Sequence, residues 1–264
     1  MSVDEAKIIS VDFFASFGFL KKFDINEDIY LTYNCLHKPA LLGIFGAILG
    51  FGGYYQAFIE KKGLPEYFEK LSSIKVGIEP INSSNGNFPK TVITYNNSVG
   101  YASKEEGGNL IIKEQTLISP RYRVYILLEN EYSQNLYNYL KNREAVFIPY
   151  LGKNDFQLYW DEVKEYKAFE YNPSSTYSIS SIFLKEEIVK SKIQESLSMD
   201  FDNENHKVFF MYFERLPIGF NQITKNYELA EFVYTNAEFE NKFRLKNLYQ
   251  IVDEKEVQKI IQVF

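Results

Sequence analysis

The chain has 264 residues, of which 45% are apolar, and a formal net charge of −6 at neutral pH. This length suits one large domain or two small ones, and the apolar content is enough for a sizeable core. The negative charge excludes a polyanion-binding surface that covers the whole protein, so any nucleic-acid site must be a local patch.

The single cysteine, Cys35, rules out an intramolecular disulfide and fits a reducing compartment. The first residues lack the basic and apolar regions of a secretory signal, so we expect a cytoplasmic protein. The apolar run 39–55 contains Gly46-x-x-x-Gly50, a pattern found in membrane dimers. It is shorter than the roughly 20 residues that a membrane span needs, so we expect no membrane partner.

Hydrophobic patterns and turn residues predict an α+β protein. The elements expected through residue 171 are, in chain order, a strand at 6–20, a helix at 39–50, a short helix at 64–73, a strand at 74–82, an irregular excursion with a hairpin at 83–108, a strand at 121–129, a helix at 132–143 that Ser133 caps, and a short strand, a glycine-containing loop and another strand at 144–171. This βαββαβ order is the ferredoxin-like arrangement, with two helices on one sheet face and the other face, or its loops, free for a ligand.

The helix at 39–50 carries glycines at positions where each costs roughly 1 kcal/mol against alanine. Gly43, Gly46 and Gly50 fall on one stripe, which permits close approach of another backbone or side chain. One interpretation is tight packing against a neighbouring element. The other concerns the helix start at His37 and Lys38, where free N–H groups favour a phosphate.

Five stretches in this order resemble the five-prime-handle-binding subunit of type I CRISPR Cascade complexes, that is, Cas family five of the RAMP superfamily. They are "VDFFASFGFLKK" (11–22), "PALLGIFGAILG" (39–50), "LISPRYRVYI" (117–126), "PYLGKNDF" (149–156) and "ERLPIGF" (214–220). No stretch is specific alone, and the ordered set carries the resemblance.

The resemblance implies a modified ferredoxin-like (RRM-like, RAMP) domain over residues 1–171, with a β-hairpin thumb at about 83–108 and a small β-rich region over 172–264. It also implies a CRISPR RNA-binding subunit of a type I-B-like ribonucleoprotein in antiviral defence. Such a subunit caps the backbone and grips the 5′ handle of the CRISPR RNA. Its partners are the last backbone subunit and the large subunit, and it meets target DNA through the complex. No cofactor is expected.

The turn around Gly152 offers groups that suit RNA. Gly152 can adopt a positive φ, Lys153 can pair with a phosphate, and Asn154 can bond a base edge or a 2′-hydroxyl. Tyr150 and Phe156 can stack on bases. An ordinary turn with buried aromatic rings is the alternative. We expect this turn and the start of the 39–50 helix to converge into one cradle for a kinked RNA strand.

Other candidates lie along the chain. Arg121 and Arg123 alternate on one strand face with Tyr122 opposite, although such arginines often serve structure alone. The complete set of expected RNA-binding residues is Lys21, Lys22, Tyr33, Asn34, His37, Lys38, Gly43, Gly46, Tyr95, Tyr101, Arg121, Arg123, Tyr150, Gly152, Lys153, Asn154 and Phe156. Within this set, Tyr95 or Tyr101 is expected at the thumb tip.

We expect no catalysis, because no Walker loop, zinc signature or dinucleotide fingerprint occurs. The alternative is a metal-independent endoribonuclease that processes precursor CRISPR RNA, with a Tyr33-His37-Lys38 cluster supplying base, acid and cation. His206, the other histidine, has no partner suggested by the sequence. A third possibility is a protein-only interaction module that docks through the glycine helix.

Overall fold

The computed structural model describes residues 6–25, 28–96, 100–106, 108–185, 209–253 and 257–264. Its central sheet has the strand order β13-β12-β8-β1-β6-β3, and all of these neighbours pair antiparallel. A short strand, β7, also pairs with β1. The bounds are β1 (Ala6–Phe14), β3 (Val76–Pro80), β6 (Arg121–Leu127), β7 (Tyr159–Trp160), β8 (Lys164–Glu170), β12 (Leu248–Val252) and β13 (Gln258–Gln262). The protein is therefore α+β and rich in strands, as the sequence predicts.

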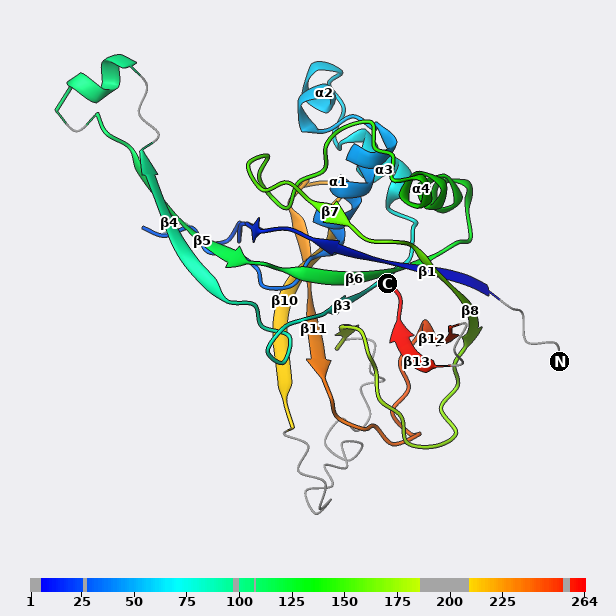
Figure 1. The fold of residues 1–264 in the computed structure, drawn as a ribbon. Coiled ribbons are helices and arrows are strands. Elements are labelled where there is room, and N and C mark those ends of the chain that lie inside the picture. The colour runs from blue at the N-terminus through cyan, green and yellow to red at the C-terminus, as the bar shows by residue number, and fades with distance from the viewer. Residues whose placement is uncertain (1–5, 26–27, 97–99, 107, 186–208, 254–256) are drawn as a thin grey trace.

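The helices lie together on one side of this sheet (Figure 1). They are α1 (Lys38–Leu49), α2 (Tyr54–Ile59), α3 (Glu66–Leu71) and α4 (Glu131–Asn142). Alternate residues of β1, such as Ile9, Val11 and Phe13, join the main apolar core on the helix side. The sequence patterns predicted α1, α3 and α4 but missed α2. The cap of α4 is Asn130, not Ser133: the Asn130 side chain accepts the Ser133 N–H, and the Ser133 Oγ accepts the Asn130 N–H in return.

The other face of the sheet is covered, which corrects the expectation that it is free. The chain end curls back, and Phe264 and Val76 exchange backbone hydrogen bonds of 3.0 and 3.2 Å. This places β13 beside β3 as well as β12. A second apolar cluster fills the enclosed space, with Ile8, Tyr125 and Ile261 among its buried members.

A hairpin projects away from the body (Figure 1). It consists of β4 (Lys90–Asn96), a 3₁₀ turn η1 (Gly100–Lys104) and β5 (Ile111–Ile118), and β2 (Phe17–Gly18) pairs with β5 near the base. This hairpin overlaps the thumb predicted at about 83–108, but its second strand runs on to residue 118. We call it the thumb.

The region after residue 171 adds a second small sheet with the order β10-β11-β9. Its strands are β9 (Phe183–Leu184), β10 (Met211–Phe220) and β11 (Tyr227–Thr235). Leu216 and Phe232 of this sheet belong to the main core. Since β12 and β13 also extend the central sheet, the two predicted regions, 1–171 and 172–264, share one core.

The glycine stripe of α1 is explained by packing against α3. A Cβ atom on Gly46 would lie 2.4 Å from the Cβ of Tyr67, whereas one on Gly43 would lie 3.8 Å from the edge of the same ring. Gly50 has a φ of 81° and ends the helix. Gly46 therefore makes room for a tyrosine, whereas Gly43 does not need to, and close packing is the interpretation that the structure supports.

These two glycines give a matched pair of variants. We expect Gly46→Ala to destabilise the protein by about 1–3 kcal/mol, because the new methyl group forces α1 and α3 apart. Gly43→Ala should be neutral or stabilising by up to about 1 kcal/mol, because it improves helix propensity without a clash. Urea unfolding of both variants measures the difference, and equal midpoints would contradict the packing argument.

Candidate nucleic-acid interface

The turn at residues 149–157 is docked against the chain that follows β2. Gly152 has a φ of 85°, and a Cβ atom there would lie 1.7 Å from the carbonyl oxygen of Phe19. The N–H of Phe19 donates to the Leu151 carbonyl at 3.1 Å. The positive φ expected at Gly152 is therefore present. Its cause differs from the expected one, because the close neighbour is protein backbone and not RNA.

Lys153, the next residue, joins this turn to the thumb. Its Nζ donates to Oε2 of Glu114 on β5 at 2.6 Å, and Tyr95 of β4 donates to Oε1 of the same carboxylate at 3.0 Å. The Lys153 Nζ also lies 4.7 Å from the ring centre of Tyr95 and 5.7 Å from that of Phe156. Because Glu114 is only 6% exposed, the carboxylate holds thumb and turn together in a partly dehydrated setting.

A second cation–aromatic pair lies beside the first. The Lys21 Nζ is 3.7 Å from the ring centre of Tyr30, and Tyr30 is the bridge partner of Glu114 on β5. Bridged residues project to the same side of a sheet. Phe17 completes the set, with its ring centre 5.8 Å from that of Phe156.

We call this set the thumb-base surface: Phe17, Lys21, Tyr30, Tyr95, Lys153 and Phe156. Aromatic faces interleaved with ammonium groups are the elements with which proteins bind single-stranded nucleic acid. Lys21, Tyr95, Lys153 and Phe156 were expected from the sequence, and Gly152 shapes the turn that carries two of them. Phe17 and Tyr30 were missed, because only the pairing of their segments with β5 brings them here.

The start of α1 does not join this surface, which corrects a central expectation. His37 is 6% exposed, its Nδ1 accepts the Ala40 N–H at 3.3 Å, and its ring packs between those of Tyr33 and Tyr227. Burial lowers the pKa of His37 to about 3. Lys38 donates to the carbonyl of Phe264 at 3.0 Å, and burial, helped by Lys75, lowers its pKa to about 8.

Three more expected residues serve the fold, and two of them, Asn34 and Gly46, are buried. Asn34 is 2% exposed, donates to the Gly86 carbonyl and accepts from the N–H of Phe88 and from Lys90. Gly43 and Gly46 are covered by Tyr67, as described above. These side chains and glycines cannot reach RNA in this structure, so the expected cradle between the helix start and the Gly152 turn is not formed.

The two arginines of β6 are committed to carboxylates. Arg123 makes a bidentate pair with Asp12 through Nε and Nη2, at 2.7 and 2.9 Å. Arg121 pairs with Asp161 and lies over the ring of Phe14. Tyr122 is buried on the opposite face, so the predicted alternation is present. The internal pairs favour the structural interpretation of these arginines.

The remaining expected residues stand at separate places. Tyr101 is 88% exposed in η1 at the far end of the thumb, whereas Tyr95 lies within β4 and not at the tip. Asn154 and Tyr150 are exposed on the Gly152 turn. Lys22 lies 5.4 Å from the ring centre of Tyr33, on the opposite side of its strand from Lys21.

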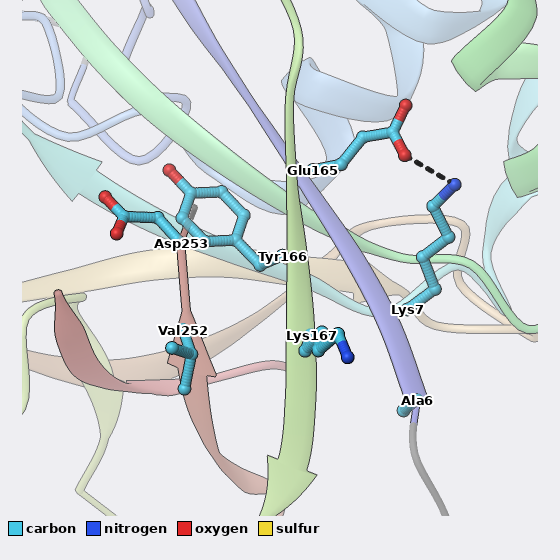
Figure 2. A pocket seen from close by; sticks show the side chains of 7 residues that line it. All are labelled: Ala6, Lys7, Glu165, Tyr166, Lys167, Val252 and Asp253. Atoms are coloured by element: carbon cyan, nitrogen blue, oxygen red, sulfur yellow. Dashed lines mark ion pairs between the residues drawn. The ribbon is translucent and has the colours of Figure 1, made fainter. Parts of the chain in front are cut away.

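A different hollow, of about 430 Å³, lies between β1, β8 and β12, away from the thumb (Figure 2). Its floor carries the ion pair between Lys7 and Glu165, with Nζ and Oε2 2.7 Å apart. Hydrogen bonds from Lys7, Tyr137 and Lys141 lower the pKa of Glu165 to about 2. The charge of Lys7 in this hollow is therefore already neutralised by Glu165.

Among the residues that the structure describes, no cluster of three or more His, Cys, Asp or Glu side chains could hold a metal ion. Within the same residues, no helix has the length and apolarity to cross a bilayer.

Comparison with known proteins gives weak structural similarity only. No family profile matches the chain, and no curated protein sequence does. A CRISPR protein from Archaeoglobus fulgidus superposes with a TM-score of 0.47 and 13% identity, covering 97% of this chain and 99% of its own. A chain of a type III-B Cmr-beta complex bound to cognate target RNA and AMPPnP superposes with a TM-score of 0.46 and 10% identity, covering 89% of this chain and 86% of its own. A chain of a CRISPR RNA-guided surveillance complex superposes with a TM-score of 0.45 and 10% identity, covering 89% of this chain and 91% of its own.

The buried cap of α1 predicts a pH effect on stability. The pKa of His37 is 6.5 when unfolded and about 3 when folded, so only the unfolded chain takes up the proton as pH falls below 6.5. We expect this residue to cost about 2 kcal/mol of unfolding free energy between pH 7 and pH 5. His37→Asn keeps a capping acceptor and should flatten the stability curve in that range. Parallel curves for the two proteins would contradict the prediction.

The ion pair at the thumb base predicts a double-mutant cycle. Lys153→Met leaves the Glu114 carboxylate buried with one hydrogen bond, and we expect a loss of about 1–3 kcal/mol in urea unfolding. Adding Glu114→Gln to Lys153→Met should recover most of the lost unfolding free energy, because the buried group is then uncharged. Lys141→Met removes a much more exposed partner of Glu165 and should cost less than about 1 kcal/mol. Additive losses for Lys153 and Glu114 would show that the pair is not coupled.

Proposed function

We propose that the protein is a non-catalytic RNA-binding subunit of a CRISPR surveillance complex, of the type I (I-B-like) kind, which grips the 5′ handle of the CRISPR RNA. The observation that carries the RNA part is the thumb-base surface, where Lys21 and Lys153 lie among the rings of Tyr30, Tyr95 and Phe156. The CRISPR assignment rests on the ordered sequence stretches that resemble Cas family five.

The topology supports a modified ferredoxin-like domain as its scaffold. The strands β1, β3, β6 and β8 form an antiparallel sheet in the order β8-β1-β6-β3, with α1 and α4 between successive strands of the chain. This is the order in which a βαββαβ chain places two helices on one face. The thumb is inserted between β3 and β6, so RNA at its base would lie at the edge of that sheet.

The surface fits an unpaired RNA strand better than a duplex. Flat aromatic groups accept any splayed base, and the neighbouring ammonium groups attract the phosphates between bases. Glu114 already neutralises part of the Lys153 charge, so Lys21 supplies the stronger phosphate contact. The affinity should therefore be modest for the isolated subunit and should fall with salt.

The endoribonuclease alternative is weakened by the position of its proposed base. His37 is enclosed, its Nδ1 accepts a backbone N–H, and burial holds its pKa near 3. A proton acceptor for a 2′-hydroxyl works best with a pKa near the operating pH and needs contact with that hydroxyl. The second histidine, His206, lies outside the described residues.

Protein neighbours have a separate surface available. Tyr55, Phe58 and Ile59 of α2 are 72, 81 and 59% exposed, and Phe147 and Ile148 are 54 and 70% exposed. Phe147 hydrogen-bonds to the α1 carbonyl of Ala47, so its segment lies beside the helix that leads into α2. Exposed apolar side chains of this kind suit a partner subunit, and we propose a backbone or large subunit there.

RNA binding by the thumb base is tested with fluorescence anisotropy on labelled single-stranded RNA copied from the CRISPR repeat. Phe156→Ala should weaken binding about 5- to 100-fold, the loss of one stacked base, without changing the salt dependence. Lys21→Ala should lower the slope of log affinity against log salt by about 0.7. Phe58→Ala on α2 and Lys61→Ala in the turn that follows it are the matched controls and should bind like the parent. Equal affinity in all four variants would exclude the thumb base as an RNA site.

A further inference from the structure

A hollow of about 250 Å³ opens on the other side of the hairpin formed by the paired segments 20–22 and 31–33. One wall is this hairpin, with Lys22 and Tyr33, and the other is β10, with Glu214 and Arg215. Its volume is below the roughly 300–1,000 Å³ of typical small-molecule sites. The contents that would fit are therefore small and polar.

One wall of the hollow is fixed by the half-buried carboxylate of Glu214. Glu214 accepts the backbone N–H groups of Asn34 and Cys35, both at 2.9 Å. These bonds attach β10 to the residues that precede α1. Because its oxygens are engaged in these bonds, Glu214 positions the walls and leaves ligand binding to other groups.

The hydroxyl of Tyr33 lines the hollow and has no hydrogen-bond partner among the residues that the structure describes, although the residue is only 2% exposed. Burial, with the nearby carboxylates of Asp24 and Glu214, raises its pKa to about 12, so the hydroxyl keeps its proton. A buried hydroxyl without a partner is costly and uncommon in folded proteins. A ligand oxygen in the hollow would satisfy it.

Two cations, Lys22 and Arg215, line the hollow together with the carboxylates of Asp24 and Glu214, and Glu231 lies opposite Arg215 on β11. Neither Lys22 nor Arg215 has a carboxylate within 4 Å in the described part of the chain, unlike Arg123 and Lys153. Asp24, at the rim, is likewise free of an ion pair there. The hollow therefore combines two cations, the hydroxyl of Tyr33 and two carboxylates, of which Glu214 is engaged by backbone N–H groups and Asp24 is in no ion pair in the described part of the chain.

The hollow is continuous with the thumb-base surface through two adjacent lysines. Lys21 pairs with Thr32 in a bridge and covers Tyr30, and Lys22 donates its N–H to Leu31 and covers Tyr33. Successive residues of an extended strand point to opposite sides. An RNA strand that crosses the hairpin at Lys21 and Lys22 would leave the thumb-base surface and enter the hollow.

We propose that the hollow receives the ribose and phosphate of one RNA nucleotide that turns away from the thumb base. Lys22 and Arg215 bind the phosphate, and the Tyr33 hydroxyl donates to one of its oxygens. Asp24 accepts a hydrogen bond from the ribose 2′-hydroxyl, the group that distinguishes RNA from DNA. The base stacks on Phe213, which is 53% exposed at the mouth. This site deepens the proposed RNA-binding function and rests on it.

The test compares the affinities of the full chain for an RNA and a DNA oligonucleotide of the same sequence. Arg215→Ala should weaken both by about tenfold, the usual effect of losing one charge-assisted hydrogen bond. Asp24→Asn should weaken only the RNA, by about fivefold, and so reduce the preference for RNA. Arg244→Ala removes an exposed arginine elsewhere and should change neither affinity.

Tyr33→Phe separates this proposal from a structural role. Removing a partnerless hydroxyl should leave the unfolding temperature unchanged or raise it, while RNA affinity falls about tenfold. If the Tyr33, Asp24 and Arg215 variants bind like the parent and Phe156→Ala does not, the hollow is not a nucleotide site and the thumb base still is. If Phe156→Ala also binds like the parent, both proposals fail.

Discussion

The backbone pairing between Phe264 and Val76 decides which surfaces of this protein are available. It returns the chain end to β3, so the sheet face opposite the helices is enclosed around Tyr125 and Ile261. The same carbonyl of Phe264 accepts from Lys38 and covers the start of α1. With both of these places occupied by protein, an open cation–aromatic surface remains at the thumb.

The thumb, in turn, depends on Glu114 for its attachment. A projecting two-stranded hairpin has little stability of its own and needs contacts at its base. Lys153 and Tyr95 supply them through one carboxylate, and the bulk of the Gly152 turn is fixed by its fit against Phe19. Stability and the proposed RNA contact thus draw on the same side chains, which is why Lys21 and Phe156, outside this bond, are the cleaner probes of the proposed binding.

Local patterns predicted much of the fold. Proline and glycine positions placed α1, strand alternation placed Tyr122 opposite Arg121 and Arg123, and the need for a positive φ at Gly152 was recognised. What the patterns could not supply were contacts between distant segments. Asp12 and Glu114 carry no local sign that they neutralise Arg123 and Lys153, and Tyr67 carries none that it fills the stripe at Gly46. His37 and Asn34, which were expected to bind RNA, are buried in the structure because distant segments such as those of Tyr227 and Gly86 pack against them.

The distribution of counter-charges shows how an acidic chain could present a local site for the proposed RNA. Each cation that pairs with a carboxylate inside the fold, as Arg123 does with Asp12, is lost to a phosphate because its field is already neutralised. Lys21, Lys22 and Arg215 lack such pairs in the described structure and lie along one hairpin and the strand beside it. These three residues therefore place positive charge without an ion pair along one path, where the phosphates of the proposed RNA strand would be attracted.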